Sequence, residues 1–400
     1  MTKIKIIFII LIVTLTSFFV FWYRSYNNKQ EKSYSSAEIQ AKKLADNPNR
    51  IRLLATGDFI AHDSVNTAAK QDDGSYNYLP LMKEFEPILA AADVRFCNDP
   101  ILNGGNQFGI TGYPKFNSPT EFVRDMGRLG CNLVNTASNH SFDFTQANIT
   151  ASVDAWDNVP NMLAVAGQNR NQAEHDQVRY FSVKGVKFAF IAYTTYSNKT
   201  PSNSYGVNVF NQTFAVRQIT EAKQQGAQII IASMRWGTEY SSTVNAAQTK
   251  NAQFLADQGV SLVLGHGPHV LQPVQQLIGK EGNKTTVWYS LGNFLNTQEP
   301  AEALFNGLAV IDFDTSSKQV TAMQYLPIYM HYEWTAKQAA AGNFDSRNNV
   351  HLYLLEAATQ DMIDRQQLKT TPEAQKARIN NLLNSKGLII PLITSRQLLD

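Results

Sequence analysis

The chain has 400 residues, of which 44% are hydrophobic and 17% are charged. This composition supports a large buried core and excludes an intrinsically disordered protein. The formal net charge of +2 excludes the strong positive field typical of nucleic-acid-binding proteins, so we expect no nucleic-acid partner.

The N-terminal segment predicts a membrane anchor. Residues 4–23 carry no charge apart from Lys5, and their number matches the roughly twenty residues that a spanning helix needs. Trp22 and Tyr23 close the segment as interfacial aromatic residues do, and no small-residue cleavage site is evident. We expect a transmembrane signal-anchor at 1–25, a polar stalk at 26–49 and the bulk of the chain outside the membrane. A cleaved signal peptide is the alternative.

Residues 50–330 read as one α/β domain. Apolar, β-rich runs predict strands at 51–56, 93–97, 131–134, 162–165, 178–183, 186–193, 227–233, 260–264, 270–278, 285–289, 308–313 and 320–326. Helical spacing and start and stop residues predict helices at 79–92, 118–129, 145–156, 214–225 and 246–258. Strands that alternate with helices, followed by antiparallel runs, favour a core with two sheets. Residues 331–400 are expected to be a C-terminal extension without a recognisable site.

Polar clusters follow several predicted strands at the point where each strand ends. Open α/β sheets carry their chemistry in such loops, so we expect these residues to meet at one rim. They are Asp58, Asn98, Asn139, His140, Asp143, Arg235, Glu239, His266, His269 and Asn293.

The sharpest of these clusters is Gly265-His266-Gly267-Pro268-His269. Two imidazoles three residues apart in a constrained loop can converge on a metal, and neutral histidine suits zinc, iron or manganese. Asp58, Asn139 and either Asn98 or Asp99 can supply oxygen atoms for the same ion, and His62, four residues after Asp58, can join them or lie at the surface. A tight turn with two surface histidines, a helix cap at Asp58 and an Asx-Pro turn at Asn98 are the structural alternatives.

Three further residues, His140, Asp143 and Arg235, are the candidate catalytic residues. His140 can protonate a leaving oxygen, and Asp143 can fix the tautomer of its imidazole or cap the following helix. Arg235 can hold an anionic oxygen through its fork, or form an ion pair with Glu239. Asn293, within 289–294, can line the same rim or belong to a simple turn. Arg235, Glu239 and Asn293 are therefore the candidate substrate-binding residues.

Only two cysteines occur, Cys97 and Cys131, each beside a predicted buried strand. We expect two packed thiols, and a disulfide between neighbouring strands is the alternative in an oxidising compartment.

Taken in order, these motifs resemble the CapA-type (PgsA) poly-γ-glutamate capsule biosynthesis proteins, whose domain is similar to calcineurin-like metallophosphatases. The resemblance rests on Gly57-Asp58, 96–101, 138–143, 235–240, 265–270 and 289–294. It implies a four-layer α/β/β/α sandwich, an extracellular domain held by a single membrane pass, and one or two divalent metal ions (Mn, Fe or Zn). It also implies an anionic capsule or cell-wall polymer and membrane-embedded synthase or export subunits as partners.

The chain departs from the family pattern at three positions. Asn98 stands where the family usually has Glu, Arg235 where it usually has His, and Gly267 where a second His is common. These changes weaken a two-metal centre more than a one-metal centre. Two hypotheses follow: a metal-dependent hydrolase with His140 as general acid, or a non-catalytic assembly factor that binds polymer or synthase.

Overall fold

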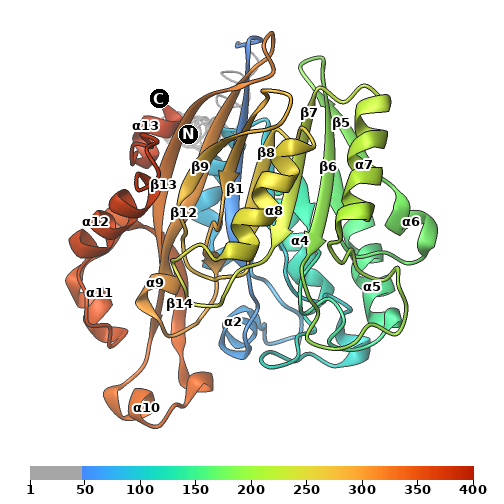
Figure 1. Cartoon of the computed structure of the whole chain (residues 1–400). Coiled ribbons are helices and arrows are strands. Elements are labelled where there is room, and N and C mark those ends of the chain that lie inside the picture. Colours follow the sequence, from blue (N-terminus) through green and yellow to red (C-terminus); the bar gives the residue numbers. More distant parts are fainter. Residues whose placement is uncertain (1–46) are drawn as a thin grey trace, which may run out of the picture.

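The computed structural model describes residues 47–400, which form two β-sheets with helices on their outer faces (Figure 1). The first sheet has the strand order β14-β13-β12-β1-β2-β3-β4, with β11 also pairing with β1, and the second has the order β5-β6-β7-β8-β10-β9. The predicted two-sheet α/β class is confirmed.

The strands have the following bounds. In the first sheet they are β1 Arg50–Phe59, β2 Val94–Asn98, β3 Leu133–Asn135, β4 Ala164–Ala166, β11 Asn293–Leu295, β12 Phe305–Asp314, β13 Val320–Glu333 and β14 Asn348–Leu354. In the second they are β5 Arg179–Val183, β6 Val186–Thr194, β7 Ile229–Arg235, β8 Leu262–His266, β9 Val274–Ile278 and β10 Lys284–Trp288.

The helices of the first half are α2 Asp63–Ala69, α3 Glu86–Ala90, α4 Thr120–Leu129, α5 Gln146–Asp157, α6 Gln172–Asp176 and α7 Gln212–Gln224. Those of the second half are α8 Ala246–Asp257, α9 Ala301–Leu304, α10 Ala336–Ala340, α11 Gln360–Arg365, α12 Pro372–Leu383 and α13 Ser395–Leu399. Short 3₁₀ turns are η1 Leu79–Leu81, η2 Lys83–Phe85, η3 Asn106–Phe108, η4 Phe344–Ser346 and η5 Leu355–Ala357.

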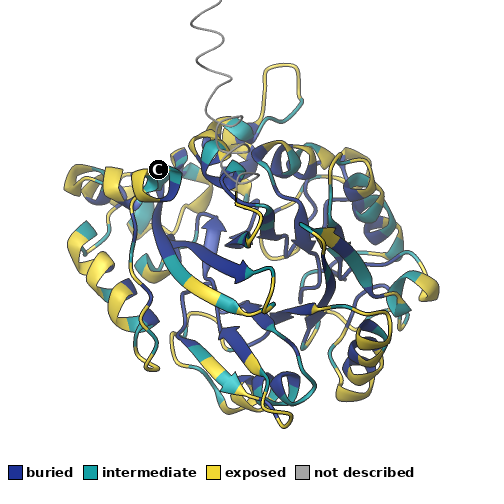
Figure 2. Cartoon of the chain, turned by 90° about the horizontal axis from the view of Figure 1, so that it is seen from above, coloured by how far each residue is buried: buried dark blue, intermediate teal, exposed yellow. Residues whose placement is uncertain are grey.

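Side-chain alternation along the second sheet divides its residues between two cores. Phe188, Phe190 and Ile231 point toward the first sheet and join the large cluster between the sheets. Their neighbours Ala189 and Ile191 point the other way and pack against α7 and α8. Buried positions accordingly fill most of the central strands, while exposed positions lie mainly on the outer helices, the loops and parts of the outer strands (Figure 2). A strand buried on both faces explains why these segments read as continuous apolar runs.

The parallel pairing determines where functional loops lie. Strands β1 to β4 are parallel neighbours in the first sheet, and β6, β7, β8 and β10 are parallel in the second. The carboxyl ends of parallel strands meet at one edge, so the loops after β1, β2, β3, β7 and β8 come together. This edge lies at the α2 end of the molecule (Figure 1).

The predicted helix at 79–92 is not one helix. It is divided into η1, η2 and α3, with Pro80 and Pro87 each in the first turn of a segment. Proline lacks the N–H that a helix interior needs, which explains the breaks. The strand predicted at 270–278 begins only at Val274, directly after Pro273.

The C-terminal residues belong to the first sheet. The boundary expected at 330 falls inside β13, which continues to Glu333 and pairs with β14. Within the segment 331–400, which was expected to carry no recognisable site, Phe344, Asp345 and Arg347 line the cleft described below.

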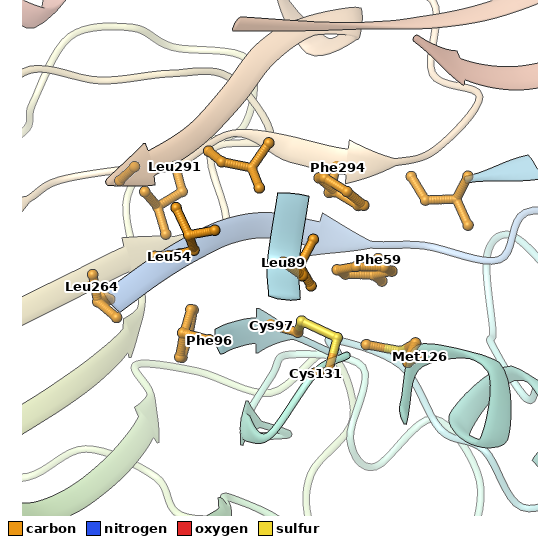
Figure 3. Packing of buried hydrophobic residues seen from close by; sticks show 14 of the residues in the cluster. Leu54, Phe59, Leu89, Phe96, Cys97, Met126, Cys131, Leu264, Leu291 and Phe294 are labelled. Carbon is orange, nitrogen blue, oxygen red and sulfur yellow. A yellow bond between two sulfur atoms is a disulfide. The ribbon is translucent and has the colours of Figure 1, made fainter. Parts of the chain in front are cut away.

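Cys97 and Cys131 form a disulfide, so the expectation of two free thiols is wrong (Figure 3). Cys97 lies in β2, and Cys131 lies in the turn between α4 and β3. Their Cα atoms are 5.8 Å apart, within the range that a disulfide spans. Adjacent strands and the turn at Gly130 (φ 120°) produce this approach, which strand prediction alone does not reveal.

The predicted anchor at 1–25 and most of the stalk at 26–49 lie outside the described residues. Within 47–400, no helix has the length and apolar character to cross a membrane.

Candidate functional site

A cleft of about 590 Å³ opens at the edge where the loops of both sheets meet. It holds six of the ten predicted site residues. These are Asp58, Asn139, His140, Arg235, Glu239 and His269. The other four, Asn98, Asp143, His266 and Asn293, lie behind this lining, and each lies within hydrogen-bond reach of another site or neighbouring residue. The predicted convergence of distant loops is therefore observed.

Asp58 is positioned by a close approach of two backbones. A Cβ atom on Gly57 would lie 2.1 Å from the Gly292 carbonyl oxygen, so only glycine fits there. This contact lets the Asp58 N–H donate to the same carbonyl at 3.0 Å, and places Asp58 opposite Asn293 in β11. The Gly-Asp pair thus fixes a fully buried carboxylate at the base of the cleft.

The Asp58 carboxylate is fully engaged by protein donors. Its Oδ2 lies 2.7 Å from His269 Nδ1, and its Oδ1 accepts from Asn98 Nδ2 at 2.6 Å. Burial alone would raise the pKa of Asp58. The His269 hydrogen bond, with the nearby imidazoles and Arg235, outweighs burial and lowers that pKa below its ordinary value. Asp58 is therefore ionised, and His269 Nδ1 is the donor.

His266 faces inward rather than into the cleft. Its Nε2 lies 2.8 Å from Ser233 Oγ and 3.1 Å from Asn135 Nδ2. An amide nitrogen only donates, so Nε2 is an acceptor. Burial, followed by the positive charge of Arg235, lowers the pKa of His266 to about 3, so the ring is neutral. Nδ1 then carries the proton, and it has no hydrogen-bond partner within 47–400.

Arg235 ends β7 with its side chain 1% exposed. Nη2 donates to Glu239 Oε1 at 3.0 Å, and the guanidinium lies over the Tyr196 ring at 4.7 Å. Nη1 is buried and lacks a hydrogen-bond partner among the described residues. Gly267 (φ 105°) leaves space beside it, since a Cβ there would lie 2.9 Å from Nη1. Arg235 thus carries an unsatisfied donor at the cleft.

His140 and Asp143 form a second pair. His140 Nδ1 lies 2.7 Å from Asp143 Oδ2, and that oxygen also accepts from the Phe116 N–H at 2.9 Å. Asp143 therefore orients the imidazole. The alternative role as helix cap belongs instead to Thr145, which forms a capping box with Asn148.

Asn139 lies beside this pair, and its amide is committed to protein partners. Nδ2 donates to Asn198 Oδ1 at 3.0 Å, and Oδ1 accepts from Ser138 Oγ at 2.9 Å. His62, four residues after Asp58, also lines the cleft. Burial, followed by the charge of His269, lowers the pKa of His62 to about 3, so its ring is neutral.

The donor set does not fit a divalent metal centre. Both Asp58 oxygens, the Asn98 and Asn139 oxygens and His266 Nε2 each accept a protein hydrogen bond. His269 Nε2 accepts no hydrogen bond from a described residue, and a permanent guanidinium is buried beside the Asp58 carboxylate. Within 47–400, no three His, Cys, Asp or Glu residues group as metal ligands do. A cation at this position would be repelled by Arg235.

Several residues that complete the site were not predicted. Asn135 and Ser233 hold His266, Asn198 contacts Asn139 and His140, and Tyr196 stacks on Arg235. Asn135 and Ser233 do sit at the carboxyl ends of predicted strands, which is a usable signal. Arg347 gives no such signal, because its place at the cleft follows from how β14 packs.

Several solved structures are similar to this chain. NAD nucleotidase of Haemophilus influenzae matches with a TM-score of 0.42 and 13% identity, covering 69% of this chain and 50% of that one. A phosphatase of Mycoplasma pneumoniae matches with a TM-score of 0.44 and 13% identity, over 70% and 94% of the two chains. The calcineurin-like phosphoesterase YfkN of Bacillus subtilis gives 0.37 and 13%, over 82% and 99%.

Sequence comparison gives a closer relationship. The PGA biosynthesis protein CapA of Bacillus subtilis (strain 168) is 26% identical over 74% of this chain and 73% of its own length. The capsule biosynthesis protein CapA of Bacillus anthracis is 25% identical over 48% of this chain and 49% of its own. The family model described as bacterial capsule synthesis protein PGA_cap matches residues 52–298, which carry all ten predicted site residues. The chain belongs to the bacterial capsule synthesis protein PGA_cap family.

Proposed function

We propose that this protein acts in the synthesis or export of an anionic surface polymer of the poly-γ-glutamate type, and that its cleft binds carboxylates of that polymer. Family membership and the printed names of the two Bacillus relatives support the first part. One observation carries the second part: Arg235 is buried at the cleft with a donor that no described residue satisfies.

The chemistry of Arg235 favours a carboxylate ligand. A guanidinium presents paired N–H groups that match the two oxygens of a carboxylate, and such bonds are stronger than neutral ones. Tyr196 holds the plane of the group, so little rotational freedom is lost on binding. The cleft volume of about 590 Å³ lies within the range of small-ligand sites.

The same geometry favours a binding role over metal-dependent hydrolysis. Two-metal hydrolysis needs ions that activate water and hold the leaving oxygen. Here the candidate ligands are hydrogen-bonded to each other, and Arg235 supplies the positive charge. An assembly factor that holds polymer for the synthase or export subunits accounts for these features.

Hydrolysis of a polymer or phosphoester bond is the second candidate, favoured by the His140–Asp143 pair alone. An aspartate that accepts from Nδ1 leaves Nε2 of the ring for proton transfer in the cleft. Incubation of the full chain with the polymer and with a generic phosphodiester tests this candidate. Turnover that is lost in His140→Ala supports it, and no turnover with intact polymer binding supports the assembly role.

We also propose that residues 4–23 anchor the protein in the cell membrane by a single pass, with the main domain outside. The apolar length and aromatic flank of that segment support this placement. Membrane fractionation and protease digestion of intact cells test it. Protein in the soluble fraction, or protected from external protease, contradicts it.

Calorimetric titration of the full chain with γ-linked glutamate oligomers tests the binding function. Arg235→Gln removes the charge and fork but retains a polar side chain. We expect it to weaken binding by at least about tenfold, because a hydrogen bond to a charged group contributes about 1.5–3 kcal/mol. Unchanged affinity in the variant, or no binding by the natural chain, contradicts the proposal.

A further inference from the structure

We propose that Arg347 forms a second anion subsite in the same cleft, so that the site recognises two carboxylates of one ligand. This inference rests on the proposed polymer-binding function and deepens it. Arg347 lies outside residues 52–298, the part of the chain that the family model matches. The second subsite is therefore a feature of this chain's C-terminal segment.

Arg347 is held rigidly at the cleft wall. Its guanidinium lies over the rings of Tyr332, Trp334 and Phe344 at 4.7, 4.5 and 4.7 Å. Nη1 donates to the Thr297 carbonyl oxygen. The residue is 7% exposed, and burial lowers the pKa of its guanidinium from the ordinary value. A buried, ring-stacked arginine loses little entropy when it binds an anion.

Two nitrogen atoms of the Arg347 guanidinium group form no hydrogen bond with a described residue. Nε and Nη2 are buried and have no hydrogen-bond partner within 47–400. Nη2 does lie 3.6 Å from Glu299 Oε1, an ion-pair distance too long for a hydrogen bond. A buried charged donor without a hydrogen-bond partner destabilises the protein. A ligand oxygen that accepts from these nitrogen atoms removes that penalty, and binding becomes more favourable by a similar free energy.

Arg235 and Arg347 share one arrangement. Each guanidinium is buried, stacks on aromatic side chains and faces a single, more exposed glutamate. Glu239 lies 3.0 Å from Arg235 with its side chain 43% exposed, and Glu299 lies 3.6 Å from Arg347 with its side chain 54% exposed. Each glutamate carboxylate occupies the position that a ligand carboxylate would take.

These glutamates are displaceable. Each glutamate side chain is about half exposed, so it can turn into solvent when a ligand arrives, and the buried guanidinium then keeps a carboxylate partner. When one carboxylate of a ligand is bound, a second carboxylate of the same ligand is held near the other subsite at a high effective concentration, so the two contacts together raise the affinity. The ligand then spans the two sheets, because Arg235 ends β7 and Arg347 directly precedes β14.

The other charged side chains of the lining narrow the ligand class. Asp63 and Asp345 also face the cleft, and Asp58 lies at its base. These carboxylates repel a densely charged chain such as polyphosphate. A polymer whose carboxylates are separated by neutral links can place each carboxylate on one of the two guanidiniums and its neutral links beside the acidic side chains. Tyr113, Tyr240 and Phe344 are exposed aromatic residues of the lining, suited to packing against such links.

The test compares glutamine, which has one carboxylate and a γ-amide, with γ-linked glutamate oligomers of increasing length, titrated into the full chain. We expect affinity to rise by at least about tenfold once an oligomer reaches both subsites. Arg347→Met keeps the stack between the rings but removes the charge, and it should abolish this gain while leaving the binding of glutamine unchanged. Arg347→Lys should recover part of the gain. Arg365→Met, a half-exposed arginine outside the cleft lining, is the matched control and should behave as the natural chain.

Removing the Glu299 carboxylate, which competes with the ligand for Arg347, should strengthen oligomer binding. Glu299→Gln is expected to tighten oligomer binding by about two- to fivefold, the equivalent of one exposed ion pair. A length-dependent gain that persists in Arg347→Met, or weaker binding in Glu299→Gln, overturns the second subsite while the proposed function stands. Absence of any binding by the natural chain overturns both, and tight binding of polyphosphate overturns the ligand class.

Discussion

The carboxylate of Asp58 and the imidazole of His269 lie 2.7 Å apart, although 211 positions separate the two residues in the chain. This contact joins the first strand of one sheet to a loop of the other. The hydrogen bonds continue through Asn98 and Asn135 to His266, so one buried polar network links both sheets beneath the cleft.

Removing the Asp58 carboxylate from this network should lower the free energy of unfolding. Asp58→Ala leaves donors of His269 and Asn98 buried without an acceptor, and we expect the free energy of unfolding to fall by about 2–4 kcal/mol. Chemical denaturation measures this change. Asp72→Ala, at an exposed position, is the control and should be near neutral. An equally small effect of both substitutions would show that the network does not stabilise the fold.

Gly57→Ala tests the backbone contact that places Asp58. The added Cβ would meet the Gly292 carbonyl oxygen at 2.1 Å, so β1 or β11 must shift. We expect a loss of at least about 2 kcal/mol of stability, together with weaker oligomer binding. Gly74→Ala meets no atom within 4 Å and carries only the strain of its positive φ. Its loss should be about 1–2 kcal/mol, with binding unchanged. Equal effects on binding would contradict the positioning role.

The disulfide predicts a redox-dependent stability. Cys97 and Cys131 close a loop with a sequence separation of 34. Loop-closure entropy then contributes about 2–4 kcal/mol. Thermal unfolding with and without reductant should show a lower Tm on reduction. The double variant Cys97→Ala/Cys131→Ala should be insensitive to reductant. A natural chain that reductant does not affect would show that the cysteines are unpaired in solution.

Asp99 predicts a dependence of stability on pH. Burial raises the pKa of this carboxyl to about 7, against hydrogen bonds from Trp156 and Asn103. The folded state thus retains a proton that the unfolded state has released above its ordinary pKa. The resulting stabilisation is complete below about pH 4 and is lost as pH rises toward 7. Asp99→Asn should flatten the decline of unfolding free energy between these values, while an unchanged slope assigns it to other groups.

Periodicity and turn residues identified most of the strands and the helices after β3, β6 and β7. Those elements are long, and their apolar faces are regular. Periodicity did not identify strands whose formation depends on tertiary packing. β11 has only three residues. β14 was not predicted although Val350, Leu352 and Leu354 alternate along it, and it completes the first sheet against β13. The disulfide likewise depends on a turn whose position only the folded sheet determines.

For the site, the sequence predicted which residues lie close together but not how their side chains are oriented. Polar residues at strand ends identified Asp58, Asn139, His140, Arg235 and His269 as neighbours, because parallel strands bring their carboxyl ends together. Their chemistry could not be predicted in the same way. Whether a histidine nitrogen faces the cleft or Ser233 depends on side-chain orientation, and Arg347 reaches the cleft only through sheet pairing.

The central claim is that a buried guanidinium, rather than a metal ion, supplies the positive charge of the cleft. The most direct measurement is the metal content of the full chain, purified in the presence of manganese, iron and zinc salts, with oligomer affinity measured before and after chelation. We expect a metal content well below one ion per chain, an oligomer affinity that chelator does not change, and loss of that affinity in Arg235→Gln. One or more tightly held ions per chain, with binding that chelation abolishes and metal restores, would contradict it.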